Sequence, residues 1–454
     1  MPSATEPPSS TPRLLISSFP GDGHTGPLLR IAAGLIQRGW DVSYLGVAMY
    51  EAKIRALGAE FFEAPDFFTP AKFAVMAKFH ELPIGPERYG FSLSHVFWAD
   101  LPQRAARLQE TLEALREREP GREIVVIEDG PNMSSIPWKH GKAVPRGFDV
   151  FPKTLGISPC PLVMQSVDAA PSPLGLPPDS SASGKLRNQA LNDLVNDGPF
   201  RVLYEKREEI FKECGCTSIP EHMPCDSWFV DFDQLLLLCS PSLEYKLSDM
   251  PSHIGFAGCL PLQPISADLQ YPSWWSEVTE KKASDKKIVF VTQGTVNFHP
   301  DDLIIPTIRA LAERSDILTI AVLGNRGASL PPDVALPSNA RVLDYFPYDA
   351  VLAHTDVFVS NAGYGGFTHA VINGVPAVFS GQTEEKPEVA ERAAVAGFAV
   401  NLRKQRPTEA QIQQGVDEVL TNGRYAKRAA ELRAENEAMD SLGLIEEQIL
   451  RLSQ

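Results

Sequence analysis

The stretch that decides the fold is residues 342–402, VLDYFPYDAVLAHTDVFVSNAGYGGFTHAVINGVPAVFSGQTEEKPEVAERAAVAGFAVNL. Short apolar and β-branched runs, such as DVFVS and PAVFS, alternate in it with segments of helical composition. Uninterrupted apolar strands separated by helices are typical of a parallel sheet that is covered on both faces. Upstream, KIVFVT at residues 287–292 and ILTIAV at residues 317–322 continue the alternation, which predicts a doubly wound α/β domain.

The same pattern opens the chain. Residues 13–46, RLLISSFPGDGHTGPLLRIAAGLIQRGWDVSYLG, predict a strand, a glycine-rich turn, an amphipathic helix and a second strand. EIVVIEDG, at residues 123–130, repeats the apolar strand that ends in a turn. Because 454 residues exceed the size of a single core, we predict an α/β protein with two Rossmann-like, doubly wound parallel-sheet domains.

Composition shifts set the predicted boundaries. We expect a disordered tail at 1–12, a first domain at 13–250, a polar linker at 251–286 and a second domain at 287–435. The helical segment 436–454 is expected to close the second domain or to return to the first. Residues 61–118 mix aromatics with prolines and predict loops and short helices that line a pocket, with plain core packing as the alternative; residues 168–184 predict a long loop or lid.

Charge and hydropathy exclude several classes of protein. A formal net charge of -15 disfavours a nucleic-acid partner. The longest apolar runs, LLLLC from Leu235 and IVVI from Ile124, are far too short to span a bilayer, and the first dozen residues lack the features of a secretory signal. We therefore expect a soluble, cytoplasmic protein. The one cysteine cluster has an unusual spacing for zinc, so reduced thiols are the favoured interpretation; its members are Cys214, Cys216 and Cys225, with His222 between them.

A histidine stands at the expected binding edge of the first domain. The loop PGDGH, residues 20–24, follows the first strand and ends at His24, and open α/β folds bind ligands at the carboxyl ends of their strands. A neutral imidazole there can take a proton from a hydroxyl, and a structural histidine in a turn is the alternative. Asp129 ends another strand and can orient the imidazole, with Glu128, which points oppositely on that strand, as the rival.

Two glycine turns follow strands of the second domain. SNAGYGG, residues 360–366, stands before a helix start, where backbone N–H groups and the helix dipole favour a diphosphate. TQGT, with Gly294 and Thr295, follows the first strand of that domain, and two such turns can grip one diphosphate. Glu384 and Glu385 follow the strand PAVFSG and can accept hydrogen bonds from sugar hydroxyls, with a solvated charged loop as the alternative.

Residues 342–402 resemble the C-terminal signature of family 1 glycosyltransferases, and the loop with His24 resembles the N-terminal motif of that family. The resemblance runs from Leu14 to the last helix and implies a GT-B fold, in which an acceptor-binding and a nucleotide-sugar-binding domain face a cleft. It implies His24 as the catalytic base and Asp129 as its partner. It further implies a donor site made of Tyr345 for the base, His369 for the ribose, Thr295, Asn361, Gly363, Gly365 and Gly366 for the diphosphate, and Glu385 and Lys386 for the sugar.

Several positions depart from the signature of the family. Asn361 replaces a histidine, His369 a glutamate, Lys386 a glutamine, Tyr345 a tryptophan, and Gly365 and Gly366 an asparagine and a serine. The chain is more similar in these positions to the microbial branch, of the macrolide and secondary-metabolite type, than to the plant branch. The residues that select the donor sugar are among those altered, so UDP-glucose is expected only as the commonest donor.

The combined prediction is an inverting hexosyltransferase that acts on a hydroxyl of a small apolar natural product or lipid. The UDP-sugar is a co-substrate, no further cofactor is expected, and no metal is expected because no carboxylate cluster accompanies the phosphate turns. The aromatic-rich residues 61–98 and the loop after Asp168 are expected to line the acceptor pocket. A sugar-nucleotide epimerase of the same architecture and a non-catalytic nucleotide-sugar-binding partner subunit are the alternatives.

Overall fold

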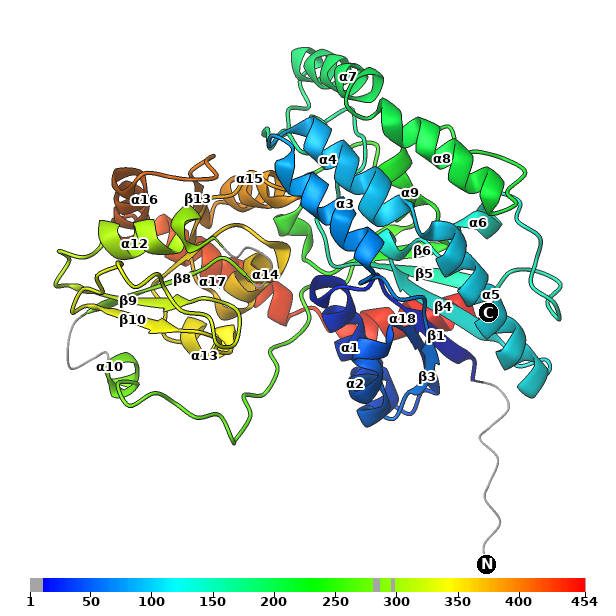
Figure 1. Cartoon of the computed structure of the whole chain (residues 1–454), viewed down its shortest axis with the longest axis horizontal. Coiled ribbons are helices and arrows are strands. Elements are labelled where there is room, and N and C mark those ends of the chain that lie inside the picture. The colour runs from blue at the N-terminus through cyan, green and yellow to red at the C-terminus, as the bar shows by residue number, and fades with distance from the viewer. Residues whose placement is uncertain (1–10, 281–285, 295–298, 454) are drawn as a thin grey trace, which may run out of the picture.

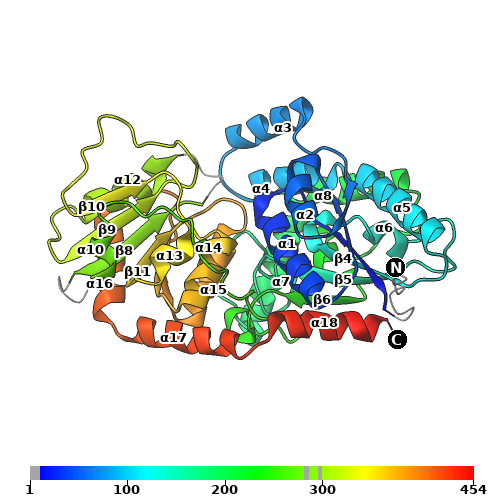
Figure 2. The same cartoon turned by 90° about the horizontal axis from the view of Figure 1, so that it is seen from below.

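The computed structural model describes residues 11–280, 286–294 and 299–453 and shows two lobes (Figure 1), each built on one sheet. Every strand pair recorded in either sheet is parallel. Helices lie on the faces of both sheets (Figure 2). The predicted class, two doubly wound parallel-sheet domains, is confirmed.

The sheet of the first lobe has the order β3-β2-β1-β4-β5-β6-β7. Its strands are β1 Arg13–Ser17, β2 Val42–Gly46, β3 Glu60–Glu63, β4 Ile124–Asp129, β5 Lys153–Ser158, β6 Gln234–Leu237 and β7 Ile254–Phe256. The second sheet has the order β10-β9-β8-β11-β12-β13. Its strands are β8 Lys287–Thr292, β9 Ile317–Val322, β10 Ala340–Leu343, β11 Val357–Ser360, β12 Ala377–Phe379 and β13 Ala399–Asn401.

Helices and loops connect these parallel strands. The α-helices of the described residues are α1 Asp22–Gln37, α2 Glu51–Ala56, α3 Pro70–Glu81, α4 Pro86–Ser92, α5 Leu101–Arg118, α6 Ile136–Lys139, α7 Ala182–Asp197, α8 Arg201–Glu213, α9 Ser227–Val230, α10 Ser276–Thr279, α12 Ile304–Ala310, α13 Tyr348–Leu352, α14 Tyr364–Asn373, α15 Lys386–Ala396, α16 Glu409–Thr421, α17 Arg424–Glu437 and α18 Ser441–Leu452. Shorter turns are η1 Ala48–Tyr50, the π-helical η2 Leu93–Trp98, η3 Gly130–Asn132, η4 Pro224–Asp226, η5 Pro241–Leu243 and η6 Pro300–Asp302.

Both sheets reverse their strand order at one point. In the first sheet the reversal lies between β1 and β4, and in the second it lies between β8 and β11. Ligands of such sheets bind outside the carboxyl ends of the strands at this switch point. His24, Asp129, Gly294 and Asn361 lie at or just after the carboxyl ends of β1, β4, β8 and β11, so the topology itself brings them to the switch points of the two sheets.

The irregular residues 61–118 are more helical than the sequence pattern suggests. They form α3, α4, η2 and the 18-residue helix α5. Proline stands in the first turn of α3, α4 and α5, where its missing N–H has no intrahelical partner to lose. The prolines that read as loop residues therefore start helices.

Strand β7 lies inside the 251–286 range that the sequence analysis gives to the linker. Its Ile254 pairs with Leu235 of β6, so the first sheet continues to Phe256 before the chain crosses to the second lobe. Residues 168–181 form a loop without a strand, as the proline and glycine content indicates.

The last helix lies against the first lobe. Figure 2 shows α17 running along the second lobe and α18 along the first. Ile445 and Ile449 are fully buried in the same apolar cluster as Leu14 and Ile16 of β1. The hydroxyl of Ser441 donates to the carbonyl oxygen of Cys259 at 2.8 Å, which fixes the start of α18.

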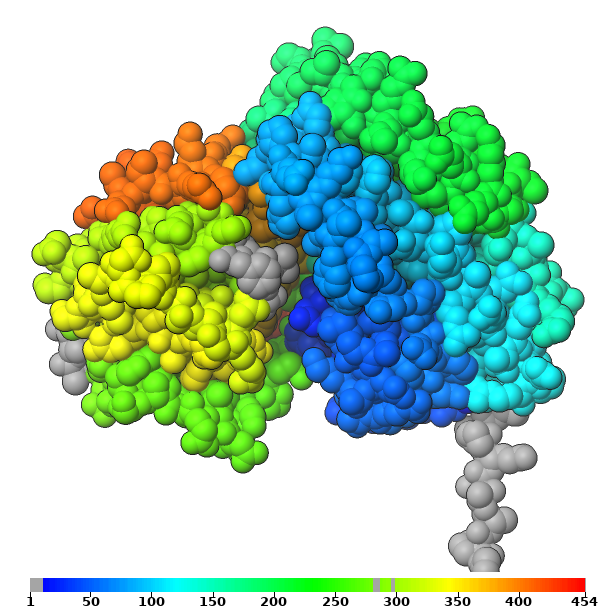
Figure 3. Space-filling view, viewed as in Figure 1, coloured from blue at the N-terminus to red at the C-terminus, as the bar shows by residue number. Residues whose placement is uncertain are grey.

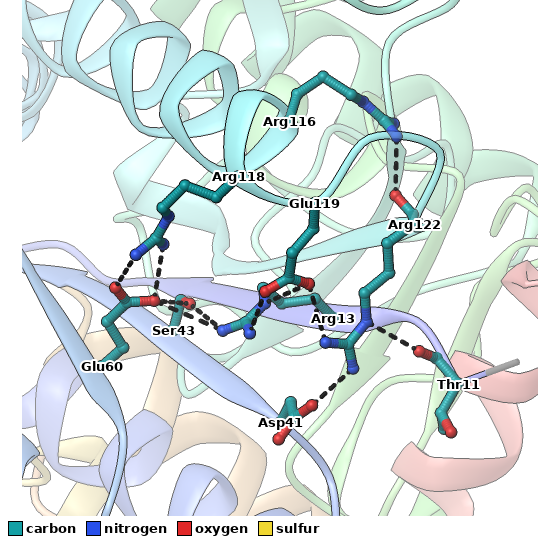
Figure 4. Close-up of polar contacts among 9 residues, drawn as sticks. All are labelled: Thr11, Arg13, Asp41, Ser43, Glu60, Arg116, Arg118, Glu119 and Arg122. Atoms are coloured by element: carbon teal, nitrogen blue, oxygen red, sulfur yellow. Dashed lines mark hydrogen bonds and ion pairs between the residues drawn. The ribbon is translucent and has the colours of Figure 1, made fainter. Parts of the chain in front are cut away.

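A charged network joins strands and helix at the end of the first sheet opposite to the switch point (Figure 4). Arg13 of β1 donates to Glu119 from Nε at 3.2 Å and from Nη2 at 2.5 Å. Arg118 binds both carboxylate oxygens of Glu60 at 2.7 and 3.0 Å, and Arg122 donates to Glu119 at 2.8 Å. The network ties β1 and β3 to the end of α5.

No helix in the described part of the chain is long and apolar enough to cross a membrane.

Candidate active site

His24 and Asp129 meet at the switch point of the first sheet. His24 lies in the first turn of α1, and Asp129 is the last residue of β4, whose neighbour in the sheet is β1. The Nδ1 atom of His24 is 2.8 Å from Oδ2 of Asp129, and the other carboxylate oxygen accepts the backbone N–H of Phe19 at 2.6 Å. A carboxylate beside Nδ1 favours the tautomer with its proton on Nδ1, which leaves Nε2 free to accept a proton.

The rival carboxylate, Glu128, is turned away from the imidazole. It is fully buried. It accepts one hydrogen bond from the hydroxyl of Ser134 at 3.1 Å and another from the backbone N–H of Ser135 at 3.1 Å. Burial raises the pKa of Glu128 to about 7. The two adjacent carboxylates therefore have different surroundings, and only Asp129 contacts His24.

Aromatic rings surround the imidazole of His24. The ring centres of Phe19 and Phe97 lie 5.5 and 6.3 Å from the centre of the imidazole. Phe97 also packs against Trp228 at 5.3 Å, and Phe19 against Phe67 at 5.0 Å. These rings come from the loop after β1, from residues 61–98 and from α9, and they give the surroundings of the histidine an apolar character.

A separate cavity of about 370 Å³ lies between α3, η2 and α8. Its lining includes Lys72, His95, Asp100, Glu205 and Lys206. Such charged walls suit an apolar ligand poorly. The aromatic cluster beside His24 is the better candidate for contact with an apolar molecule.

The glycine turns of the second lobe are joined by Asn361. Its side-chain amide donates to the backbone oxygen of Gln293 at 2.7 Å, which links the turn after β11 to the turn after β8. Gly363 caps the N-terminus of α14, and a Cβ atom added at Gly365 would meet nothing within 4 Å. Open space at a helix N-terminus can admit a diphosphate.

Two further residues of this edge carry no clear signal in the sequence. Gln293 is buried, and its Oε1 atom accepts the backbone N–H groups of Leu303 at 3.2 Å and Ile304 at 3.0 Å. A Cβ atom at Gly381 would lie 2.3 Å from the backbone oxygen of Asn361, so only glycine fits there. Gly294 has a φ of +74°, which favours glycine, and Thr295 lies outside the described residues.

Tyr345, at the expected base-stacking position, is 43% exposed. The guanidinium of Arg326 lies 4.6 Å from the centre of its ring. Asp344 holds the surrounding loops together, because its two oxygens accept the backbone N–H groups of Tyr345 and Gly327, each at 2.7 Å. One face of the tyrosine ring is thus covered by a cation, and its exposure allows a flat ligand to stack.

His369, at the expected ribose position, has a carboxylate partner that the sequence analysis missed. Its Nδ1 atom is 2.7 Å from Oδ1 of Asp349, which also accepts from the amide of Asn373 at 2.9 Å. Burial alone would raise the pKa of Asp349, but the contacts with His369 and Asn373 lower it overall. Asp349 belongs to α13 and His369 to α14, so only the packing of these two helices reveals the pair.

The residues expected at the donor sugar form an ion pair among themselves. Lys386, the first residue of α15, binds the carboxylate of Glu384. Burial opposes the charge of each group, yet the pairing raises the pKa of Lys386 and lowers that of Glu384. Glu385 is the N-cap of α15 and also favours the charged form of Lys386.

Charged groups of the two lobes act on one another across the space between them, where Figure 3 shows the surface hollowed between the blue and yellow segments. The charge of Arg88, from α4, lowers the pKa of Glu384, together with the larger effect of Lys386. On the other side, burial lowers the pKa of Arg30, from α1, and the charge of Asp349 opposes this change. Charged residues of α1 and α4 in the first lobe therefore lie close enough to the second lobe to interact with its charges.

The cysteine cluster has ordinary partners in the structure. The thiol of Cys216 donates to the carbonyl oxygen of Pro137 at 3.5 Å, and Nε2 of His222 lies 3.0 Å from the hydroxyl of Ser227. Burial raises the pKa of Cys214 to about 12. Within the described residues, no group of three or more histidine, cysteine or acidic side chains could hold a metal ion.

Comparisons with known proteins agree with this arrangement. Residues 314–447 match the family described as erythromycin biosynthesis protein CIII-like, C-terminal domain. UDP-glucosyltransferase 1 of Beauveria bassiana is 36% identical over 97% of this chain and 95% of its own length. UDP-glucosyltransferase A1 of Starmerella bombicola is 34% identical over 98% of this chain and 93% of its own length.

Solved structures share the fold over nearly the whole chain. The glycosyltransferase of kitacinnamycin has a TM-score of 0.71 at 20% identity and covers 98% of this chain and 100% of its own. The spinosyn rhamnosyltransferase SpnG, complexed with spinosyn aglycone, has a TM-score of 0.61 at 17% identity and covers 96% and 99%. Another structure of SpnG contains thymidine diphosphate, with a TM-score of 0.62 at 16% identity.

Proposed function

Because the chain belongs to the UDP-dependent glycosyltransferases, we propose that it moves a hexose, glucose from UDP-glucose, to a hydroxyl of a small apolar natural product or lipid, with inversion at the anomeric carbon. The observation that carries the proposal is the contact of 2.8 Å between Nδ1 of His24 and Asp129. It supports a base whose free nitrogen, Nε2, lies among aromatic side chains at the edge that faces the glycine turns.

In the proposed reaction, Nε2 of His24 takes the proton of the acceptor hydroxyl as the oxygen attacks the anomeric carbon. The oxygen–carbon bond forms on the face opposite to the diphosphate, and the bond from carbon to the diphosphate oxygen breaks with its electron pair. Asp129 stabilises the imidazolium that results. A direct displacement of this kind inverts the anomeric configuration.

The departing diphosphate carries negative charge away from the sugar. We place it at the N-terminus of α14, beside Gly363, Gly365 and Gly366, where the space around Gly365 is open and the helix dipole favours an anion. Gly294 and Thr295 belong to the second glycine turn that the sequence predicts for the same group. No metal is part of this proposal, which makes resistance to chelators a direct test.

Tyr345 and His369 are proposed to bind the nucleoside. The exposed ring of Tyr345 supports stacking of the base, with Arg326 behind the ring. Asp349 supports the tautomer of His369 in which Nε2 accepts a hydrogen bond from a ribose hydroxyl. Glu385, beside the Glu384–Lys386 pair, is proposed to accept hydrogen bonds from the sugar.

The acceptor is proposed to lie against the aromatic side chains around His24. Phe97 and Trp228 supply apolar surface next to the base, and Phe68, which is 40% exposed, extends it toward solvent. The curated relative 4'-demethylrebeccamycin synthase, 32% identical over 95% of this chain, carries a natural product in its name. This supports an acceptor of the same broad class.

The test is incubation with UDP-glucose and a panel of hydroxylated aromatics, polyketides and hydroxy fatty acids, in the presence of a chelator. We expect a product heavier by one hexose and, by NMR, a β-linkage from the α-configured donor. Retention of the α-configuration would refute inversion, and loss of turnover that magnesium or manganese restores would refute the metal-free proposal.

The same experiment separates the two alternatives. Conversion of UDP-glucose to another sugar nucleotide without an acceptor would favour an epimerase. Tight binding of UDP-glucose with no product from any acceptor would favour a non-catalytic partner subunit. The His24–Asp129 contact does not favour the partner subunit, because a protein that only binds a nucleotide sugar needs no base on the facing lobe.

A further inference from the structure

Arg104 is a buried arginine beside the His24–Asp129 pair. It belongs to α5, and only 8% of its surface is exposed. Its Nη2 atom donates to the backbone oxygen of Phe97 at 2.5 Å, and its guanidinium lies 5.4 Å from the centre of the Phe19 ring. Both aromatic rings flank the imidazole of His24.

The contacts of Arg104 lead to both members of the pair. Phe19 packs on Phe97 with ring centres 4.6 Å apart, so one guanidinium holds two touching walls of the site. The backbone N–H of Phe19 donates to Asp129 at 2.6 Å. A shift of Phe19 would therefore move both the ring beside His24 and a hydrogen-bond donor of its carboxylate partner.

The positive charge of Arg104 is not taken up by a contacting carboxylate. In the part of the chain that the structure describes, no acidic oxygen lies within 4 Å of its guanidinium nitrogens, and nearby Asp100 pairs with Lys72 at 2.6 Å. Burial lowers the pKa of Arg104 to about 10, and Asp129 and Glu128 are among the carboxylates that oppose this change. Arg104 is thus charged at neutral pH, and the carboxylates at the end of β4 feel its field.

A small cavity places the guanidinium at the carboxyl ends of β1 and β4. Its volume is about 20 Å³, and its polar lining comprises Arg104, Ser17, Ser18, Asn132 and Ser134. Asn132 donates to the hydroxyls of Ser17 at 3.0 Å and Ser134 at 3.1 Å. Ser134 in turn donates to Glu128. The hydrogen bonds among Asn132, Ser17 and Ser134 thereby link the cavity that Arg104 lines to the end of β4, which carries Asp129.

We infer that Arg104 is a positioning residue for the proposed base: it fixes the Phe19 and Phe97 walls around His24 and sets a positive charge next to the His24–Asp129 pair. The inference rests on the proposed role of His24. A positive charge near an imidazole disfavours the imidazolium, so a neutral residue in place of Arg104 is expected to make protonation of His24 easier.

Other titratable groups surround the imidazole. On α1, Asp22 accepts from the hydroxyl of Tyr50 at 2.9 Å. On β4, Glu128 has a pKa of about 7. After β5, burial raises the pKa of the Cys160 thiol well above its usual range, with Glu385 of the facing lobe and Asp129 adding to the effect. Arg30, farther along α1, is a second cation, and its side chain donates to the backbone oxygen of Pro261. Among the described residues, Arg104 is the cation that contacts both Phe19 and Phe97, the residues whose rings flank His24.

The experiment compares the acid limb of the kcat/KM profile in the parent, Arg104→Met, Arg104→Gln and Arg104→Lys. The midpoint of the acid limb is expected to rise by about one pH unit in Arg104→Met and Arg104→Gln, because the imidazolium is no longer opposed. Arg104→Lys, which keeps the charge, is expected to stay near the parent. The matched control is Arg107→Met on the same helix, since Arg107 binds the backbone oxygen of Glu63 and the carboxylate of Glu110 on the outer face.

A second readout needs no turnover. The chain has nine histidines, and the ring-carbon NMR signal of His24 is assigned by its loss in His24→Gln. Its titration midpoint should rise in both Arg104→Met and Arg104→Gln. Two neutral variants are used so that the test remains possible if one of them does not fold. The inference would be overturned if the midpoint in Arg104→Met and Arg104→Gln equalled that in the parent and in Arg107→Met. It would also be overturned if Arg104→Lys raised the midpoint as much as the two neutral variants do. An active His24→Ala enzyme with shifted midpoints would instead refute the proposed base while leaving the electrostatic coupling intact.

Discussion

His369 illustrates how one substitution changes what a site can recognise. With its Nδ1–H directed at Asp349, the neutral imidazole offers one acceptor atom, Nε2, whereas the glutamate typical of the family offers two oxygens. Two ribose hydroxyls then compete for a single acceptor. The nucleotide site should therefore depend little on the 2′-hydroxyl.

This leads to a prediction about nucleotide binding. 2′-Deoxy-UDP should bind the parent within about threefold of UDP, and His369→Glu should widen the difference to about tenfold, in line with one net hydrogen bond. Isothermal titration calorimetry measures both affinities without an acceptor. A parent that already discriminates tenfold, or a His369→Glu variant with an unchanged ratio, would contradict the assignment of His369 to the ribose.

The site was partly predictable from residues alone. His24 and Asp129 follow apolar strands, and strand ends of a parallel sheet converge at one edge, so the pattern predicts that they meet. Asp349 and Arg104 carry no such signal, because each lies on a helix and becomes relevant only through packing against another element. Lys386 and Glu384 are close in sequence, but Lys386 binds Glu384 and not Glu385 because of the conformation of the turn before α15.

At the scale of elements, the network at the far end of the first sheet stabilises β1, β3 and α5 together. Contacts with arginine side chains lower the pKa of Glu60, and the contacts with Arg13 and Arg122 lower the pKa of Glu119 against the opposing effect of burial. A lowered carboxyl pKa contributes stability above the unfolded-state pKa of about 4.3 and loses it as pH falls through the folded-state pKa.

We predict that Glu60→Gln combined with Glu119→Gln lowers the free energy of unfolding by about 1 kcal/mol at pH 7, because both carboxylates are about one-third exposed and partly screened. Urea unfolding at pH 7 and at pH 4 measures the difference in the free energy of unfolding between the variant and the parent. The difference from the parent should shrink at pH 4 and in 1 M salt, whereas Glu117→Gln on the same helix should have no effect. A difference that is independent of pH and salt would show that packing, not charge, explains the loss.

The elements themselves were predictable to different degrees. Apolar strands separated by helices gave a strong pattern, because a strand buried on both faces has little choice of residues. Helices α3 to α5 were underpredicted because their first turns contain proline and their faces mix aromatic, charged and small residues. HIGFAGCL, residues 253–260, has the composition of a short strand, and β7 lies there, although the predicted linker begins at residue 251.

At the scale of the whole molecule, a buried arginine joins the lobes. Arg392 of α15 binds Glu244 at 2.5 Å, Glu388 at 2.9 Å and the backbone oxygen of Leu162 at 2.6 Å. Its guanidinium lies 4.1 Å from the centre of the Tyr245 ring. The partners Glu244, Leu162 and Tyr245 precede the crossing to the second lobe, so the cluster fixes α15 against the first lobe.

The loop at residues 168–181 takes part in the same junction. The backbone N–H of Gly175 donates to Glu388 at 2.8 Å, and a Cβ atom at Gly175 would lie 2.7 Å from Cβ of Pro387. Residue 175 has a φ of +57°, which also favours glycine. The loop predicted as a lid is therefore anchored to the helix that follows the proposed sugar-binding residues.

Arg392→Met should destabilise the protein by about 3 kcal/mol, because it removes a shared partner of two buried carboxylates. Burial already raises the pKa of Glu388, and Arg392 opposes this effect. In the variant the pKa of Glu388 should rise further, so the loss is smaller at pH 5.5, where the group takes up a proton, than at pH 8. Thermal unfolding at both pH values measures the loss of stability. The control is Arg433→Met, which removes the exposed ion pair of Arg433 with Glu437. A loss equal to that control would contradict a buried interlobe ion pair.

The central claim is that His24 is the base of a glycosyl transfer. Its most direct test is the single-turnover rate of glucose transfer from UDP-glucose to an acceptor identified by the panel, in the parent and in His24→Ala, with UDP affinity measured for both. The account predicts a loss of at least about 100-fold in rate, with unchanged UDP affinity, since the proposed UDP site lies on the other lobe. A His24→Ala enzyme that transfers glucose at the rate of the parent would contradict it.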